Sequence, residues 1–102
     1  MIGSLSAKEI STMLGRSQVF KSPLFLAHYV RGSEFKVGFS IRRSFGSAVE
    51  RNRFKRVVRS RLKKNNMASL CVLIKVISKI NLSDQLYTDL NLFCSHVTKI
   101  NN

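Results

Sequence analysis

Residues 42–64 of this 102-residue chain read RRSFGSAVERNRFKRVVRSRLKK, a pattern that predicts one long basic helix. The stretch holds ten of the 18 Lys and Arg residues of the chain and a single acid, Glu50. Ser47 and Glu50 have the spacing of a capping box, in which each side chain accepts a hydrogen bond from the backbone N–H of the other residue. We therefore predict a helix over residues 48–64.

The predicted helix has an apolar side and a basic side. At about 100° per residue, four apolar side chains share one arc: Phe54, Val57, Val58 and Leu62. The opposite arc carries Asn52, Arg53, Lys55, Arg56, Arg59 and Lys63. Arg51 and Arg61 fall on the apolar side, and we expect their long side chains to reach water along its edges.

The charge of this helix indicates a polyanionic partner. A helix face that is merely solvated usually mixes acids and bases, whereas this face has almost no acid to offset its repulsion. The whole chain has a net charge of +13 and a pI near 10.8. Nucleic acid is the favoured partner, and an acidic membrane surface is the distant alternative.

The remaining segments predict a single α+β domain over residues 1–102, with an ordered core from about 5 to 99. The predicted strands cover residues 19–21, 24–31, 35–42 and 70–76. The predicted helices cover residues 7–14, 48–64 and the run from Ser83 to Val97. The order α-β-β-β-α-β-α indicates a sandwich in which helices cover a mixed sheet of about four strands.

Alternation within the predicted strands suggests which side chains face the core. Residues 35, 37, 39 and 41 are apolar and should face inward, which leaves Lys36, Gly38, Ser40 and Arg42 on a flat surface. That surface is either lightly packed or open to an extended ligand strand. Over residues 24–31 both faces carry bulky side chains, so the pattern does not choose the core side.

The sequence offers no self-sufficient catalytic site. Its five acids show no paired spacing, and neither the two cysteines nor the two histidines have a metal-binding spacing. We expect the thiols to be buried and unpaired. No apolar run approaches the roughly 20 residues of a membrane span, and the N-terminus lacks the features of a secretory signal. These observations predict a cytoplasmic binding protein with no membrane association.

Residues 45–59, FGSAVERNRFKRVVR, together with the preceding strand VGFSI at 37–41, resemble the signature of the bacterial ribonuclease P protein component. The resemblance extends from about Leu5 to Val97. It implies a ribosomal-protein-like fold with a left-handed βαβ crossover, against the general right-handed preference. It also implies a subunit of the endonuclease that removes the 5′ leader of precursor tRNA, in which the RNA component is catalytic.

Two sets of residues follow from this resemblance. Contact with the catalytic RNA is expected from Arg43, Arg51, Asn52, Arg53, Lys55, Arg56, Arg59 and Lys63. A leader-binding cleft between the first helix and the open sheet is expected from Ile10, Leu14, Phe25, Tyr29, Ser40 and Arg42. In this chain Ile10 and Leu14 stand where the family commonly has aromatic residues, and Ser44 stands where it usually has a basic one.

The resemblance further implies the partners and the metal chemistry. The partners are the catalytic ribonuclease P RNA and precursor tRNA, with one protein per RNA. The protein itself binds no cofactor or metal, and Mg²⁺ is expected on the RNA subunit. The alternative is a structural RNA-binding protein such as a ribosomal component, because a small-subunit ribosomal protein domain has the same fold type.

Overall fold

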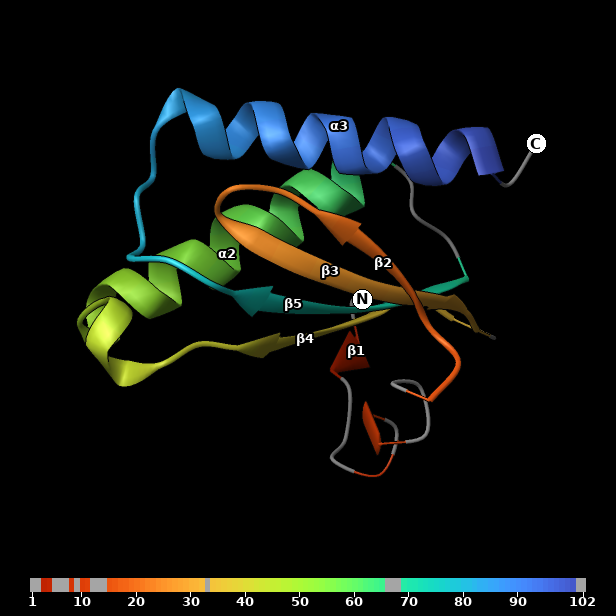
Figure 1. Cartoon of the computed structure of the whole chain (residues 1–102), viewed down its shortest axis with the longest axis horizontal. Helices are drawn as coiled ribbons and strands as arrows, with labels where there is room; N and C mark the ends of the chain where they lie inside the picture. The colour runs from red at the N-terminus through yellow and green to blue at the C-terminus, as the bar shows by residue number, and fades with distance from the viewer. Residues whose placement is uncertain are drawn as a thin grey trace.

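A computed structural model of the chain describes residues 3–4, 8, 10–11, 15–32, 34–65 and 69–100 (Figure 1). The elements in chain order are β1 (Gly3–Ser4), β2 (Gln18–Lys21), β3 (Phe25–Arg31), β4 (Lys36–Ser40), the 3₁₀ turn η1 (Arg43–Phe45), α2 (Ala48–Lys64), β5 (Leu70–Val76) and α3 (Asp84–Ile100). Lys8, Ile10 and Ser11 are helical. The other residues of the helix predicted over 7–14 lie outside the described part.

The strands form one mixed sheet in the order β1-β4-β5-β3-β2. The central strand β5 runs parallel to β4 and antiparallel to β3, while β2 is antiparallel to β3. The α+β class with a mixed sheet is therefore confirmed. The additional fifth strand is β1, whose two residues pair in parallel with Lys36 and Val37. A two-residue strand has no pattern of its own, since only its pairing with β4 defines it.

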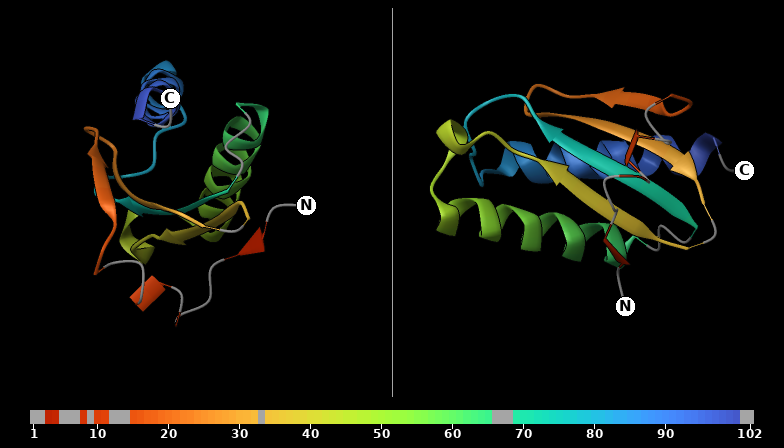
Figure 2. Two further views of the ribbon diagram at one scale, coloured as in Figure 1. Left: turned by 90° about the vertical axis from the view of Figure 1, so that its right-hand side faces the viewer. Right: turned by 90° about the horizontal axis from the view of Figure 1, so that it is seen from below.

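The connection from β4 through α2 to β5 is left-handed, as the resemblance implies. In the right-hand view of Figure 2 the parallel strands β4 and β5 point to the left and β5 lies above β4. Helix α2 lies behind the sheet in the same view. A chain that passes through the three elements in this arrangement makes a left-handed turn.

Both long helices cover the same face of the sheet, as the left-hand view of Figure 2 shows. The core between these layers holds Phe54, Val58 and Leu62 of α2, together with Leu86, Leu90, Phe93 and Val97 of α3. The odd-numbered residues Phe25, Ala27 and Tyr29 of β3 face this core and are at most 5% exposed. The sheet therefore has one face packed under helices and a second face without a long helix.

Local signals account for the bounds of α2. The Ser47 backbone N–H donates to Glu50 Oε1 at 2.9 Å, and the Glu50 N–H donates to Ser47 Oγ at 3.1 Å, so the predicted capping box is present. At the other end the Asn65 side-chain amide donates to the Arg61 carbonyl at 2.8 Å. Strand β4 ends at Ser40, two residues earlier than predicted, because the Arg42 carbonyl accepts from the Phe45 N–H in the 3₁₀ turn.

Candidate nucleic-acid interface

The outer side of α2 presents basic side chains that have no acidic partner on the helix. Asn52, Arg53, Arg56 and Lys63 are exposed, as the sequence predicts. Within the described residues, no basic side chain of α2 forms a salt bridge. The single acid, Glu50, is engaged by the capping box, whose hydrogen bonds from Ser47 lower its pKa. The helix therefore carries uncompensated positive charge that a polyanion can neutralise.

Three predicted RNA-binding residues lie at the margins of α2 and are half-buried: Arg51, Lys55 and Arg59. The Arg59 guanidinium lies over the Phe39 ring, 5.2 Å from its centroid, and Phe39 in turn meets Phe54 edge-on. The Arg51 Nε donates to the Ser47 carbonyl at 3.4 Å. These contacts hold the two guanidinium groups beside the helix and leave part of each exposed.

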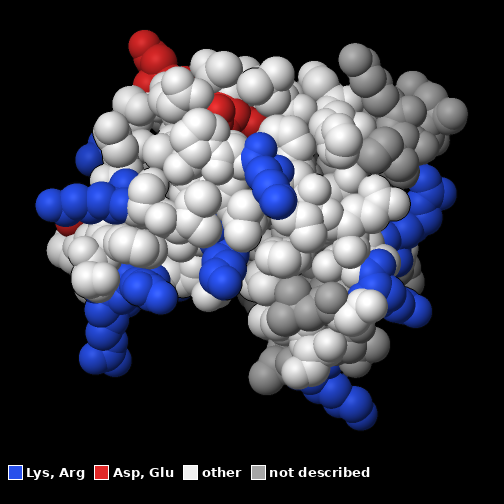
Figure 3. All heavy atoms as spheres, in the orientation of Figure 1, with Lys and Arg blue, Asp and Glu red and all other residues white. Residues whose placement is uncertain are grey.

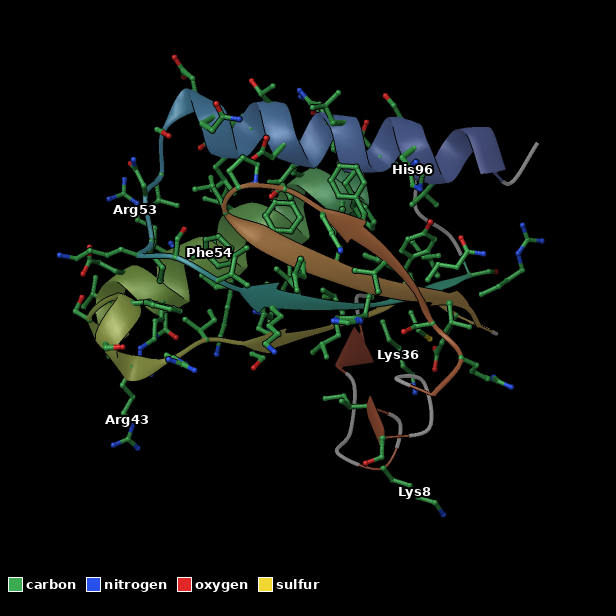
Figure 4. All side chains as sticks on the ribbon, viewed as in Figure 1. Lys8, Lys36, Arg43, Arg53, Phe54 and His96 are labelled. Carbon is green, nitrogen blue, oxygen red and sulfur yellow. The ribbon has the colours of Figure 1, made fainter. Side chains whose placement is uncertain are left out.

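Arg43 lies outside the helix, in the 3₁₀ turn, and is exposed. Figure 4 shows Arg43 and Arg53 directed away from the fold on different sides of the chain, whereas Phe54 points between α2 and the sheet. In the view of Figure 3, basic side chains lie along the left-hand, lower and right-hand edges and near the centre, while most of the visible acidic atoms lie toward the upper edge, where α3 runs. The positive surface therefore extends beyond α2 itself.

A separate cleft of about 480 Å³ lies on the sheet face that has no long helix. It is lined by Ile10, His28, Phe39, Ser40, Leu73 and Lys75. The strand register brings the lining residues of β3, β4 and β5 together. Leu73 and His28 stand in one row across β5 and β3, which Gly38 of β4 continues. Ser40 and Lys75 stand in the adjacent row. Ser40 is exposed at one side of the cleft, and its small side chain leaves room there for an extended ligand.

The cleft combines apolar contact with positive charge. Burial lowers the pKa of His28, and the nearby Lys75 charge lowers it further. A phosphate placed here would meet the Lys75 ammonium, while Leu73 and Ile10 offer apolar contact to a base or a ribose. Among the described residues that line it, none is a carboxylate. The cations and apolar side chains of the cleft are therefore suited to bind a nucleic-acid strand.

The structure places only some of the predicted leader-binding residues in the cleft. Ile10 and Ser40 line the cleft. Leu14 lies outside the described residues, and Arg42 is exposed just beyond the end of β4 without lining the cleft.

The assignment of Phe25 and Tyr29 to the cleft is corrected. Both face the helices, with exposures of 0% and 5%. The Tyr29 hydroxyl donates to Gln18 Oε1 at 3.0 Å and lies 3.0 Å from His96 Nε2 of α3. Because alternate residues of a strand point to opposite faces, the buried position of Tyr29 turns His28 toward the cleft.

Sequence reasoning missed His28, Leu73 and Lys75 as cleft residues, whereas Phe39 borders the cleft with its ring turned toward Phe54 of α2, as predicted. One signal was available: Lys75 is the only charge in the apolar run of β5, and a charge in a strand buried on both sides needs a reason. His28 could be assigned only once the core side of β3 was known. Its position depends on pairing with β5, a strand more than forty residues later in the sequence.

The described residues contain no cluster of three or more His, Cys, Asp or Glu that could hold a metal ion. None of the described helices is long and apolar enough to cross a lipid bilayer.

The chain is similar to proteins of a known family over most of its length. The model of the family described as Ribonuclease P matches residues 5–99. The ribonuclease P protein component of a Nitratiruptor species is 34% identical over 53 residues, which make up 52% of this chain and 49% of that protein. The alignment thus spans about half the length of this curated relative.

Solved structures of low sequence identity share the fold. The Staphylococcus aureus RNase P protein superposes with a TM-score of 0.73 at 18% identity, covering 97% of this chain and 94% of that one. The RNase P protein from Thermotoga maritima gives a TM-score of 0.64 at 17% identity, covering 95% and 93%. The agreement in fold extends over almost the whole of both chains.

Proposed function

This chain belongs to the ribonuclease P family, and on that premise we propose that it is the protein subunit of a ribonucleoprotein endoribonuclease. It binds the catalytic RNA and the 5′ leader of precursor tRNA, and thereby assists removal of the leader. The observation that carries the proposal is the pairing of an unneutralised basic helix with an open cleft on the opposite face of the same sheet. One surface serves the catalytic RNA and the other serves the substrate.

The outer side of α2 contacts the catalytic RNA. Exposed arginines bind phosphate oxygens in a bidentate manner, and the Asn52 amide can both donate to and accept from a ribose or a base edge. Arg53 and Arg56 have no acid beside them that would have to be displaced, so their charge is available to the RNA. Arg59 and Lys55 add contacts at the margin of the helix that faces β4.

The cleft holds the single-stranded leader. An extended strand lies across the cleft at Ser40, with Lys75 beside its phosphates and Leu73 and Ile10 beside its bases. Ile10 offers apolar contact instead of aromatic stacking, so leader binding draws less on stacking and more on charge. We infer that the protein raises the affinity of the complex for precursor tRNA by this route.

The RNA subunit supplies the chemistry, with Mg²⁺ held by RNA. The protein contributes by neutralising phosphates and by positioning the leader. We expect one protein per catalytic RNA and a cytoplasmic location, where tRNA precursors are processed.

A cleavage assay tests the proposal. A 5′-extended precursor tRNA is incubated at near-physiological Mg²⁺ with the cognate catalytic RNA alone, with the protein alone, and with both. We expect faster leader removal with both and no cleavage by the protein alone. Tight binding of the RNA without any gain in cleavage would instead identify a structural RNA-binding protein. Cleavage by the protein alone would contradict the assignment of catalysis to the RNA.

A further inference from the structure

A second hollow lies between the two long helices, on the face of the sheet opposite the cleft. This α2–α3 groove has a volume of about 340 Å³ and is lined by Arg56, Val57, Ser60, Arg61, Lys64 and Tyr87. Its size is at the lower end of the range of about 300 to 1,000 Å³ for small-ligand pockets, which suits a ligand the size of one nucleotide. None of the six residues except Arg56 belongs to the RNA-binding set predicted from the sequence.

The lining of the α2–α3 groove combines three cations, an aromatic ring and a hydroxyl. The Arg61 guanidinium lies over the Tyr87 ring, 4.7 Å from its centroid, so a side chain of α2 and a ring of α3 meet in a cation–π contact at the groove. No acid lines it. Among the described acids, Asp84 precedes Tyr87 by one turn of α3 without lining the groove, and Asp89 is only 2% exposed.

The composition of the groove favours a nucleotide over a simple anion. A phosphate requires only the cations, whereas the half-buried Tyr87 ring and its stacked guanidinium provide a surface for a base. Ser60 adds a hydroxyl that can donate to or accept from a base edge or a ribose. Arg56 is exposed on the outer side of α2 and also lines the groove, so the two surfaces are continuous.

We propose that the α2–α3 groove receives one unpaired nucleotide of the RNA that is bound on α2. Its base stacks against the Tyr87–Arg61 pair, and its phosphates contact Arg56 and Lys64. The inference rests on the proposed function for its RNA partner. The nucleotide is not part of the leader, because the sheet separates the groove from the cleft. Tyr87 thereby recognises an unpaired base, whereas the cations of the groove contact only its phosphates.

The test compares a short oligoadenylate with inorganic polyphosphate as probes, using the wild-type protein, Tyr87→Leu and Tyr87→Phe. Loss of the ring should weaken oligoadenylate binding about tenfold, the effect expected for one stacked base. Tyr87→Phe retains the ring and should bind as the wild type does. Polyphosphate should bind all three equally. Unchanged oligoadenylate affinity in Tyr87→Leu, or an equal loss for polyphosphate, would overturn the proposal.

A measurement on the wild-type protein provides an independent test that needs no variant. The chain has two tyrosines and no tryptophan, and Tyr29 is buried, so tyrosine emission reports on Tyr87 when a ligand binds outside the core. Oligoadenylate should quench this emission after correction against N-acetyltyrosinamide, while polyphosphate should not. Absent quenching, or equal quenching by both probes, would contradict base stacking. In the binding experiment with the Tyr87 variants, Leu92→Ala changes an exposed apolar position of α3; it is the matched control and should bind both probes as the wild type does.

The catalytic RNA itself separates this inference from the proposed function. If the wild-type protein does not bind the catalytic RNA, the proposed function is wrong. If the wild type binds it and Tyr87→Leu binds equally well, only the nucleotide site is wrong. Weaker binding by Tyr87→Leu, with cleavage restored at high protein concentration, would support both.

Discussion

Removing one exposed arginine from α2 should make the slope of log RNA affinity against log salt concentration shallower by the contribution of one phosphate contact. Four of the predicted RNA-binding cations are exposed, namely Arg43, Arg53, Arg56 and Lys63, and three more are half-buried. If between about four and seven phosphates are neutralised, at about 0.7 to 0.9 per phosphate, log affinity should fall against log salt with a slope of about −3 to −6. Arg53→Ala should reduce the magnitude of this slope by about 0.7 to 0.9.

The assay is a titration of labelled catalytic RNA at a series of salt concentrations. Arg53→Lys retains the charge and should keep the slope, although it loses the bidentate geometry. Lys21→Ala removes an exposed cation from β2, at the far edge of the sheet from β4, and serves as the control. Since Arg53 is exposed and outside the core, its removal should change the free energy of unfolding by less than about 0.5 kcal/mol.

Two results would refute this reasoning. A slope that is unchanged in the Arg53→Ala/Arg56→Ala double variant would show that the outer side of α2 does not contact phosphates. A slope that falls equally in Lys21→Ala would show that the charge of the whole protein, and not the helix surface, determines the affinity.

Three further predictions concern stability and reactivity. Ser47→Ala should destabilise the protein by about 1 kcal/mol in urea unfolding at neutral pH, because Ser47 Oγ accepts a hydrogen bond from the Glu50 backbone N–H. Ser47 also lowers the pKa of Glu50 below its usual 4.5, so part of this loss should disappear as the pH falls through that lowered pKa, whereas an unchanged stability at neutral pH would contradict the capping box. Burial lowers the pKa of His28 below its usual 6.5, so protonation favours the unfolded chain and the melting temperature should fall as the pH drops through 6.5. His28→Gln should show less of this fall, and identical pH profiles of the melting temperature in the two proteins would contradict the account. Burial raises the pKa of Cys94 to about 11, so the folded protein holds little of the reactive thiolate at mildly alkaline pH. Iodoacetamide should therefore modify Cys94 only in urea, and rapid modification of Cys94 in the native protein would show that the thiol is accessible.

The parts of the fold that sequence reasoning predicted are those with local signals. Helix α2 has its capping box, its apolar arc and Asn65 within one continuous stretch, and the structure gives the predicted bounds. The bounds of β5 were likewise predictable, because seven residues in a row are mostly apolar. Neither prediction required knowledge of a distant segment.

The cleft could be predicted only in part, because the pairing of distant strands creates it. In β3 both faces are bulky, and contacts with β2 and α3 turn Phe25 and Tyr29 inward. Once that choice is made, His28 must face the cleft beside Leu73. The sequence contains the residues of the cleft without any local sign that they are neighbours.

The hand of the β4–α2–β5 connection determines which side of the sheet remains reachable. A right-handed connection between the same two strands would carry α2 to the other side of the sheet. A helix there would lie over Gly38, Leu73 and His28, and the cleft would become interior. The uncommon hand therefore leaves one side of a five-stranded sheet accessible in a protein of only 102 residues. A chain this short can thus present two different surfaces to two strands of RNA at once, with one layer of backbone between them.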